Sequence, residues 1–363
     1  MNVTVVTARE LTADLRGLWS TIRAGRPDLA SPYFTPEFVA AADSCRYGVR
    51  VGVIEDGGRP IGFLPFELRP FGIGGPVGGR LSDFQAPIVP AGVALDPAWL
   101  VARCGLRLLR FDHLLPDASG FERSTEITAG SPVVDLGGGF DRYYSARPST
   151  TCIDRVVQKA RRLRRVHRDV TFEYDCRENA VLDQVIAWKR QQCRRTGVVD
   201  FLAQLPNVDL LRAIHHCRTP AFAGVLSVLR VDGRIAAAHF GMRSQDTLHH
   251  WFPAYEHDLA AFSPGLVLLL DLLKSAAAAG LVRLDFGKGE EQYKRSFCTH
   301  ELMVGEGAVA ARPVYAWLRR CRVRSVGFLR RSRVAAPLRA SVRAVRGIWP
   351  RVVATAGVVG GET

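Results

Sequence analysis

The chain has no arrangement of cysteines that would hold a metal ion or a disulfide framework. Its 363 residues include eight cysteines, with no Cys-x-x-Cys pair and no regular spacing. Zinc ribbons and disulfide scaffolds require regularly spaced cysteines, so reduced thiols in a cytoplasmic protein are the expectation that remains. Two adjacent histidines, His249 and His250, do not form a metal site on a strand, because their side chains point to opposite faces. We therefore expect no metal.

Long apolar runs are also scarce. The longest, residues 266–282, is interrupted by Asp271 and Lys274 and is short for a membrane span, so it predicts a buried helix. The N-terminus has no charged segment followed by an apolar one, and we expect no signal peptide. A glycine-rich stretch at residues 72–79 lacks the Lys-Ser/Thr pair of a P-loop. It is interpreted as a flexible or acceptor-lining loop.

Positive charge is in excess, but it is unevenly distributed. The net charge is +14, and residues 312–363 hold twelve arginines against one acid, Glu362. At helical spacing, residues 314–331 place apolar and arginine side chains on opposite faces. This pattern predicts either an interfacial helix attracted to anionic lipid or a helix docked on the protein's own body. A second basic segment, residues 159–165, is either a solvated helix face or a contact surface for an anionic substrate or RNA.

The two halves of the chain repeat one plan of secondary structure. Apolar runs flanking Asp-Gly turns predict hairpins over residues 50–66 and 222–242. A glycine-rich linker at residues 137–139 separates the halves. We expect an α/β (α+β) fold with two related units, each a mixed twisted sheet flanked by helices, followed by a basic helical tail. The predicted boundaries are 1–136, 137–311 and 312–363.

The most informative stretch is the helix start at residues 263–265. A strand over 247–252 precedes it, the helix runs from Leu266 to about Gly280, and a strand over 281–286 follows. Because the first amides of a helix have no partner within it, they can bind an anion such as a pyrophosphate. This order of elements predicts a phosphate-binding cradle. The candidate cofactor-binding residues are Phe252, Ser263, Pro264, Gly265, Leu266 and Gly287.

Several segments resemble the CelD/Fem-like branch of the GNAT acyltransferases. They are residues 31–38, 81–89, 262–266, 285–289 and 293–297. The resemblance implies acetyl-CoA or another acyl-CoA as co-substrate. It also implies an amine or hydroxyl of a cell-envelope or exopolysaccharide precursor as acceptor, and a cytoplasmic enzyme peripheral to the inner membrane. The superfamily's Gln/Arg-x-x-Gly-x-Gly/Ala phosphate loop is absent, since residues 260–265 read Ala-Ala-Phe-Ser-Pro-Gly.

Four side chains are candidates for catalysis. Asp285 ends an apolar strand, where it would accept the amine proton, position the acceptor or hold the following turn. Lys294 would neutralise a phosphate or an anionic acceptor, and Tyr293 would protonate the leaving thiolate; the alternative is a solvated lysine beside a packed tyrosine. His239 lies among apolar residues, either lining the cleft or hydrogen-bonded in the core.

Two other functions fit the same sequence. Fem-like proteins take an amino acid from aminoacyl-tRNA, and the basic helix at residues 159–168 would then contact RNA. The long helical-hairpin insertion of Fem proteins is absent, so nucleic acid is expected only under this alternative. A degenerate GNAT pair would instead be a non-catalytic, membrane-docked scaffold in polysaccharide synthesis. The oligomeric state stays open.

Overall fold

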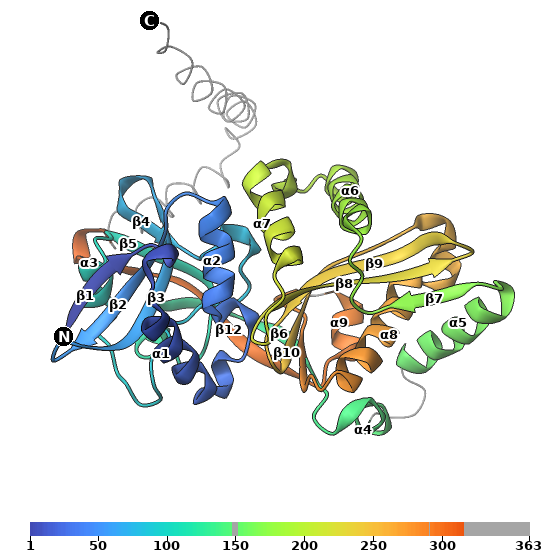
Figure 1. Cartoon of the computed structure of the whole chain (residues 1–363), viewed down its shortest axis with the longest axis horizontal. Coiled ribbons are helices and arrows are strands. Elements are labelled where there is room, and N and C mark those ends of the chain that lie inside the picture. The colour runs from blue at the N-terminus through green and yellow to red at the C-terminus, as the bar shows by residue number, and fades with distance from the viewer. Residues whose placement is uncertain (147–151, 290, 316–363) are drawn as a thin grey trace, which may run out of the picture. The chain divides into compact units, whose positions relative to one another are not determined.

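The computed structural model describes residues 1–146, 152–289 and 291–315. Residues Met1–Ala311 form one compact unit. Within the described residues, twelve strands join in a single mixed sheet, in the order β1-β2-β3-β4-β5-β12-β6-β11-β10-β9-β8-β7 (Figure 1). The expected α/β fold is confirmed. The interfacial helix predicted over 314–331 lies outside the described residues, apart from residues 314 and 315.

The first half of the chain builds one end of the sheet. Its strands are β1 (Asn2–Val6), β2 (Val49–Asp56), β3 (Arg59–Arg69), β4 (Ile73–Gly75) and β5 (Leu108–Leu114). Helices α1 (Ala13–Ala24) and α2 (Pro36–Cys45) contact β3 and β2, and α3 (Pro97–Arg103) contacts β1. Thr12 and Thr35 cap α1 and α2 by accepting hydrogen bonds from backbone amides. The buried Trp19 of α1 stacks on Phe63 of β3 at 4.6 Å between ring centroids, which fixes this helix on the sheet.

The second half builds the other end. It contains α4 (Gly139–Ser145), α5 (Cys152–Val166), β7 (Val170–Glu173), α6 (Asn179–Thr196), α7 (Leu205–His216), β8 (Ala223–Val231), β9 (Arg234–Arg243), β10 (Thr247–Tyr255), α8 (Pro264–Ala278), β11 (Arg283–Asp285) and α9 (Gln292–Phe297). The predicted hairpin over 222–242 is β8–β9. Helices α6 and α7 contact this part of the sheet, as does α8, against which α4 and α5 pack (Figure 1).

Two strands cross between the halves. β6 (Thr125–Asp135) pairs with β11 of the second half, and β12 (His300–Ala310) returns to pair with β5 of the first half. β6 and β12 also pair with each other, so the sheet is continuous. Helices α2 and α7 pack together where the halves meet. The junction is therefore built by elements from both ends of the chain.

Helix α8 is buried along most of its length, as its apolar run predicts. The acid within it, Asp271, accepts a hydrogen bond from Arg164 of α5 at 2.6 Å. This partner offsets the free-energy cost of burying a carboxylate. None of the helices in the described part of the chain is long and apolar enough to cross a bilayer.

Candidate active site

A pair of parallel strands separates at the centre of the second half. β10 and β11 are paired only from Thr247 opposite Arg283 to His249 opposite Asp285. β11 ends there, whereas β10 continues to Tyr255, with a bulge between His249 and Phe252. In the described residues no strand pairs with this side of β10 beyond His249. Because backbone amides and carbonyls need partners, an opening of this kind can receive a ligand.

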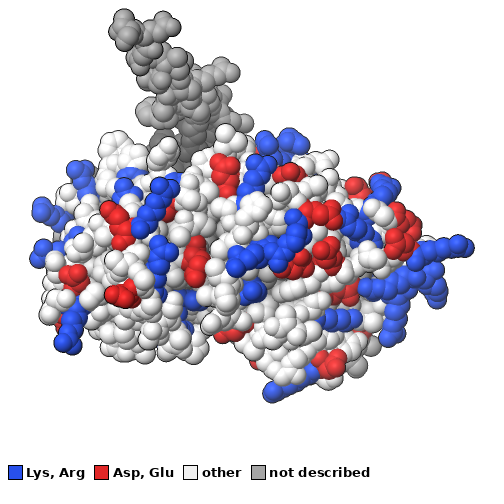
Figure 2. All heavy atoms as spheres, in the orientation of Figure 1, with Lys and Arg blue, Asp and Glu red and all other residues white. Residues whose placement is uncertain are grey.

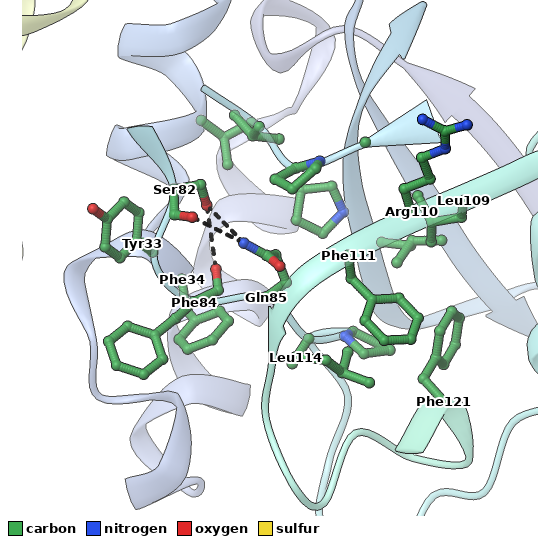
Figure 3. Close-up of a pocket in the computed structure, with 18 of the residues that line it drawn as sticks. Tyr33, Phe34, Ser82, Phe84, Gln85, Leu109, Arg110, Phe111, Leu114 and Phe121 are labelled. Atoms are coloured by element: carbon green, nitrogen blue, oxygen red, sulfur yellow. Dashed lines mark hydrogen bonds between the residues drawn. The ribbon is translucent and has the colours of Figure 1, made fainter. Parts of the chain in front are cut away.

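The first half contains a corresponding parallel pair, β4 and β5. The segment around Gln85 and Ile88 bonds to the neighbouring strands and fills the space beside this pair. Gln85 bonds to β5 through its backbone, and its side-chain Oε1 accepts from the amides of Asp112 and His113 at 3.0 and 2.8 Å. Ile88 bonds to Phe63 of β3. Figure 3 shows the Gln85 amide directed toward Ser82 within the remaining cavity of about 40 Å³. That volume suits water rather than a cofactor.

The start of α8 lies beside a cationic side chain. Ser263 has φ of 51°, a left-handed conformation that is uncommon for serine, and its Oγ accepts a hydrogen bond from Lys159 Nζ of α5 at 2.7 Å. The amides of Leu266 and Val267 both donate to the Ser263 carbonyl. The Gly265 amide has no acceptor among the described residues. The predicted cradle therefore offers one free backbone donor and a lysine ammonium group.

Helix α5 adds further positive charge around this corner. Basic side chains gather on its part of the surface in Figure 2, and the guanidinium of Arg162 lies 5.5 Å from the centroid of the Phe262 ring. The exposed arginines of this helix are Arg155, Arg161, Arg162, Arg164 and Arg165. Lys159, Arg162 and the Gly265 amide lie at this corner and suit an anionic group such as the diphosphate of CoA.

A buried acid–histidine pair lies where β10 and β11 begin to separate. His249 Nε2 is 3.0 Å from Asp83 Oδ2, although the two residues are 166 positions apart. The His249 side chain is 0% exposed and that of Asp83 is 23% exposed. Burial acts to raise the pKa of Asp83, but the hydrogen bond and charge of His249, with the charges of His113 and Lys294, outweigh it and lower that pKa. Asp83 is therefore a carboxylate at neutral pH.

The charge of Asp83 determines the hydrogen positions in this pair. An ionised carboxylate only accepts hydrogen bonds, so His249 carries its proton on Nε2. The other ring nitrogen, His249 Nδ1, is buried without a partner in the described residues. An orphaned buried nitrogen of this kind indicates a place for a ligand, a water or a proton in transit.

Further polar groups from both halves surround the pair. His113 Nε2 lies 3.7 Å from Asp83 Oδ1. Lys288 Nζ donates to the Asp112 carbonyl at 3.0 Å, and Lys294 Nζ donates to the Lys288 carbonyl at 3.3 Å. Lys294 is 7% exposed and also pairs with Glu291 at 3.2 Å. The structure thus places Lys294 with this cluster around Asp83.

Asp285 and Gly287 belong to the same surroundings. Asp285 is fully buried; its Oδ1 accepts from Arg283 Nε at 2.7 Å, and its Oδ2 has no partner in the described chain. Gly287 has φ of 68°, and a Cβ there would lie 2.6 Å from Asp83 Oδ2. Only glycine permits the turn after β11 to approach the carboxylate this closely. The predicted roles of these two residues stay predictions.

His239 and Tyr293 lie in a neighbouring, more apolar layer. His239 stacks on His250 at 4.3 Å between ring centroids, and its Nε2 accepts from the Trp251 amide at 3.3 Å. Burial lowers the pKa of His239 to about 3, so its ring is neutral. The Tyr293 ring packs against Phe286 and His250, and burial raises the pKa of its hydroxyl. Both predicted residues are thus near the separating strands, in uncharged forms.

One group of side chains in the described residues has the spacing of a metal site. Ligand atoms of Glu173, Cys176 and Glu178 lie within 4.8 Å of one another. Glu178 already pairs with Arg230 at 2.8 Å, and burial raises the pKa of the Cys176 thiol. The group lies around the end of β7, the edge strand of the sheet, whereas His249 lies on β10.

The Asp83–His249 pair is the part of the site that the sequence did not reveal. Asp83 lies in the segment 81–89, which carries part of the family resemblance, but nothing in the sequence indicated its partner. The one available signal is a lone acid between Ser82 and Phe84, in a stretch with no other charged residue. The position of His249 beside His250 indicates only that the two do not share a metal on a strand.

Comparison with known proteins agrees with this geometry. Residues 153–295 match the acetyltransferase (GNAT) domain, which includes nearly all of α5 and the whole of β10, α8 and β11. No curated protein sequence matches the chain. The match confirms the expected resemblance to GNAT acyltransferases over these residues, and the likenesses below show the shared fold.

Three solved structures share the fold. FemX is 10% identical, with a TM-score of 0.57, over 87% of this chain and 99% of FemX. The C-terminal domain of a putative lysylphosphatidylglycerol synthetase from Agrobacterium fabrum is 15% identical, with a TM-score of 0.52, over 85% and 95% of the two chains. A tandem GNAT protein from the clavulanic acid biosynthesis pathway is 10% identical, with a TM-score of 0.51, over 86% and 99%.

Proposed function

We propose that this chain, a GNAT-type acyltransferase by its matching domain and its fold, transfers an acyl group from acyl-CoA to an amine or hydroxyl. Acetyl is the default acyl group. The donor lies between β10 and β11, with its diphosphate at the start of α8 beside Lys159. The observation that carries the proposal is the Asp83–His249 pair, with its unpartnered Nδ1, at the point where these parallel strands separate.

Two residues near the separating strands can accept and donate the protons that move in the reaction. As the nucleophile bonds to the thioester carbonyl carbon, the C–S bond breaks, one proton leaves the nucleophile and one reaches the thiolate. His249 Nδ1 takes the first proton, and the Asp83 carboxylate stabilises the imidazolium that forms. Tyr293 is protonated at neutral pH because burial raises its pKa. Its hydroxyl gives the second proton to the thiolate; solvent then returns a proton to the Tyr293 oxygen, and the His249 imidazolium releases its proton to solvent.

The bulge of β10 supplies a candidate donor for the developing oxyanion. The Trp251 amide makes only a long hydrogen bond of 3.3 Å, to the neutral ring of His239. A backbone amide that can exchange such a bond for one to an oxyanion would stabilise the transition state more than the ground state. In this proposal His239 holds the amide in position, and it does not act as the base.

For the acceptor we propose a cell-envelope or exopolysaccharide precursor, used at the cytoplasmic side of the inner membrane. The resemblance of the sequence to the CelD/Fem-like branch supports this proposal. The position of the Asp83–His249 pair, between elements of the two halves, gives the acceptor surfaces from both.

Binding of the donor tests the proposal directly. Isothermal titration with acetyl-CoA is expected to show saturable binding by the wild-type protein. Lys159→Ala should weaken that binding about ten-fold or more, because a charged hydrogen-bond donor to phosphate is lost. Lys274→Ala is the matched control, since Lys274 lies on α8 at a distance from its start and is half exposed. Equal affinities for all three proteins would contradict the proposed donor position.

The exposed arginines of α5 also suit RNA, so aminoacyl-tRNA is the second candidate donor. In native mass spectrometry of the protein taken from cells, retained CoA species would favour the acyltransferase. Retained tRNA, together with no binding of acetyl-CoA, would favour the aminoacyl-tRNA-dependent transferase. A protein that binds neither would be the non-catalytic scaffold.

A further inference from the structure

A second polar hollow lies where the two halves meet. It has a volume of about 250 Å³. Arg46, Glu67, Arg69 and Arg80 of the first half and Phe201 and Asn207 of the second half lie in its wall. Three arginines and one acid therefore face a single space.

One of the three arginines is fully engaged. Arg46 donates to both oxygens of Glu67, from Nε at 2.9 Å and from Nη2 at 3.0 Å. Its Nη1 donates to Asn207 Oδ1 on α7. The Glu67 side chain is 10% exposed. The one carboxylate among the lining residues is therefore neutralised by Arg46 in this bidentate pair. The charges of Arg69 and Arg80 are left over.

Arg69 and Arg80 have no carboxylate partner in the described chain, and the guanidinium of Arg69 approaches that of Arg46. A Cβ at Gly79 would lie 3.1 Å from Arg46 Nη2 and 3.6 Å from Arg69 Nη2. Gly79 has φ of 62°, and any side chain there would fill the space beside both groups. Arg69 thus lies beside Arg46 without a carboxylate of its own, and a bound anion would offset the repulsion between the two guanidinium groups.

The hollow is close to the proposed site of transfer. Arg80 and Asp83 are three residues apart, so their Cα atoms are separated by at most about 11 Å. On the other side, the Phe201 ring packs against Phe252 of β10 at 6.2 Å between centroids. The hollow is thus bordered on both sides by residues close in the chain or in space to the acid–histidine pair and to β10.

We infer that this arginine pocket binds an oxyanion, a phosphate or a carboxylate, carried by the acceptor. Arg69 and Arg80 hold the oxyanion, while Arg46 is held in place by Glu67 and Asn207. The pocket thereby selects anionic acceptors and places their nucleophile toward His249. As an assignment of the acceptor, this inference rests on the proposed function; as an anion site, it stands on the geometry of the pocket alone.

Arginine labelling of the full chain tests the pocket without acyl-CoA. Phenylglyoxal modification is followed by mass spectrometry, with inorganic phosphate in one arm and acetate in the other. Phosphate or acetate is expected to slow labelling of Arg69 and Arg80 several-fold and to leave Arg59 unaffected. Arg59 is the control because it is exposed at the opposite end of the same strand, β3. The more protective anion identifies the group on the acceptor.

Two variants complete the test. Arg80→Gln changes an exposed side chain. It is expected to raise the anion concentration needed to protect Arg69 by about ten-fold, whereas Arg59→Gln should leave that concentration unchanged. Labelling of Arg69 and Arg80 that neither anion slows would overturn the inference, even if acetyl-CoA binds normally. Protection of both arginines in a protein that does not bind acetyl-CoA would uphold the anion pocket and remove the proposed function instead.

Discussion

Replacement of Asp83 by asparagine tests the acid–histidine pair in depth. The change removes a charge-assisted hydrogen bond of 3.0 Å to a fully buried histidine. Such bonds contribute about 1.5–3 kcal/mol. Because the asparagine side chain can still accept one neutral hydrogen bond, we expect Asp83→Asn to lower the free energy of unfolding at pH 7 by about 1–2 kcal/mol. Chemical denaturation measures this difference, with the exposed Asp209→Asn on α7 as control.

The dependence of this difference on pH has a definite sign. The pKa of Asp83 is lowered in the folded protein, so its contribution to stability is fully present above the unfolded value of about 3.9. It is lost as pH falls through the folded pKa. The gap between wild type and Asp83→Asn should therefore narrow at acid pH. A gap that stays constant, or widens, below pH 4 would refute the assignment of Asp83 as a carboxylate held by His249.

The same variant has an expected effect on catalysis. Without the carboxylate, the imidazolium of His249 is no longer stabilised, and the rate of CoA release from acetyl-CoA should fall by about 10²-fold or more. The affinity for acetyl-CoA should not change, because Asp83 lies apart from the start of α8. A variant that keeps the wild-type rate would show that the pair only stabilises the fold.

Three further predictions concern other residues. Arg46→Gln leaves Glu67 buried without its guanidinium partner and should lower the free energy of unfolding by about 3 kcal/mol in urea denaturation; a loss below about 1 kcal/mol would contradict the engaged pair. The carbon shifts of the His239 ring should stay constant between pH 5 and 8 in NMR spectra, because its pKa is about 3; a titration in that range would show a solvated ring. Tyr293→Phe should slow CoA release about 10²-fold at unchanged affinity for acetyl-CoA, and an unaltered rate would remove Tyr293 as the acid.

Local elements were predictable from the sequence where short-range patterns determine them. The Asp-Gly turns located the hairpins that became β2–β3 and β8–β9, and Pro264 marked the start of α8. The resemblance to GNAT enzymes predicted the overall fold. These features depend on neighbouring residues, so no knowledge of distant contacts was needed.

Distant contacts were not predictable. β6 pairs with β11 of the second half, and β12 pairs with β5 of the first half. Nothing in the composition of β6 or β12 indicates these partners. Asp83 and His249 meet across the same junction, and His239 is buried in a neutral form because of its neighbours in space. The four candidate catalytic residues all came from the second half, whereas the structure also brings Asp83 of the first half beside His249.

The position of the donor is the central claim, and a crystal structure of the protein with acetyl-CoA tests it most directly. We predict the diphosphate within hydrogen-bonding distance of the Gly265 amide and Lys159 Nζ, and the thioester beside the bulge of β10. Acetyl-CoA bound anywhere else on the chain, or this opening left empty at saturating concentration, would contradict the account.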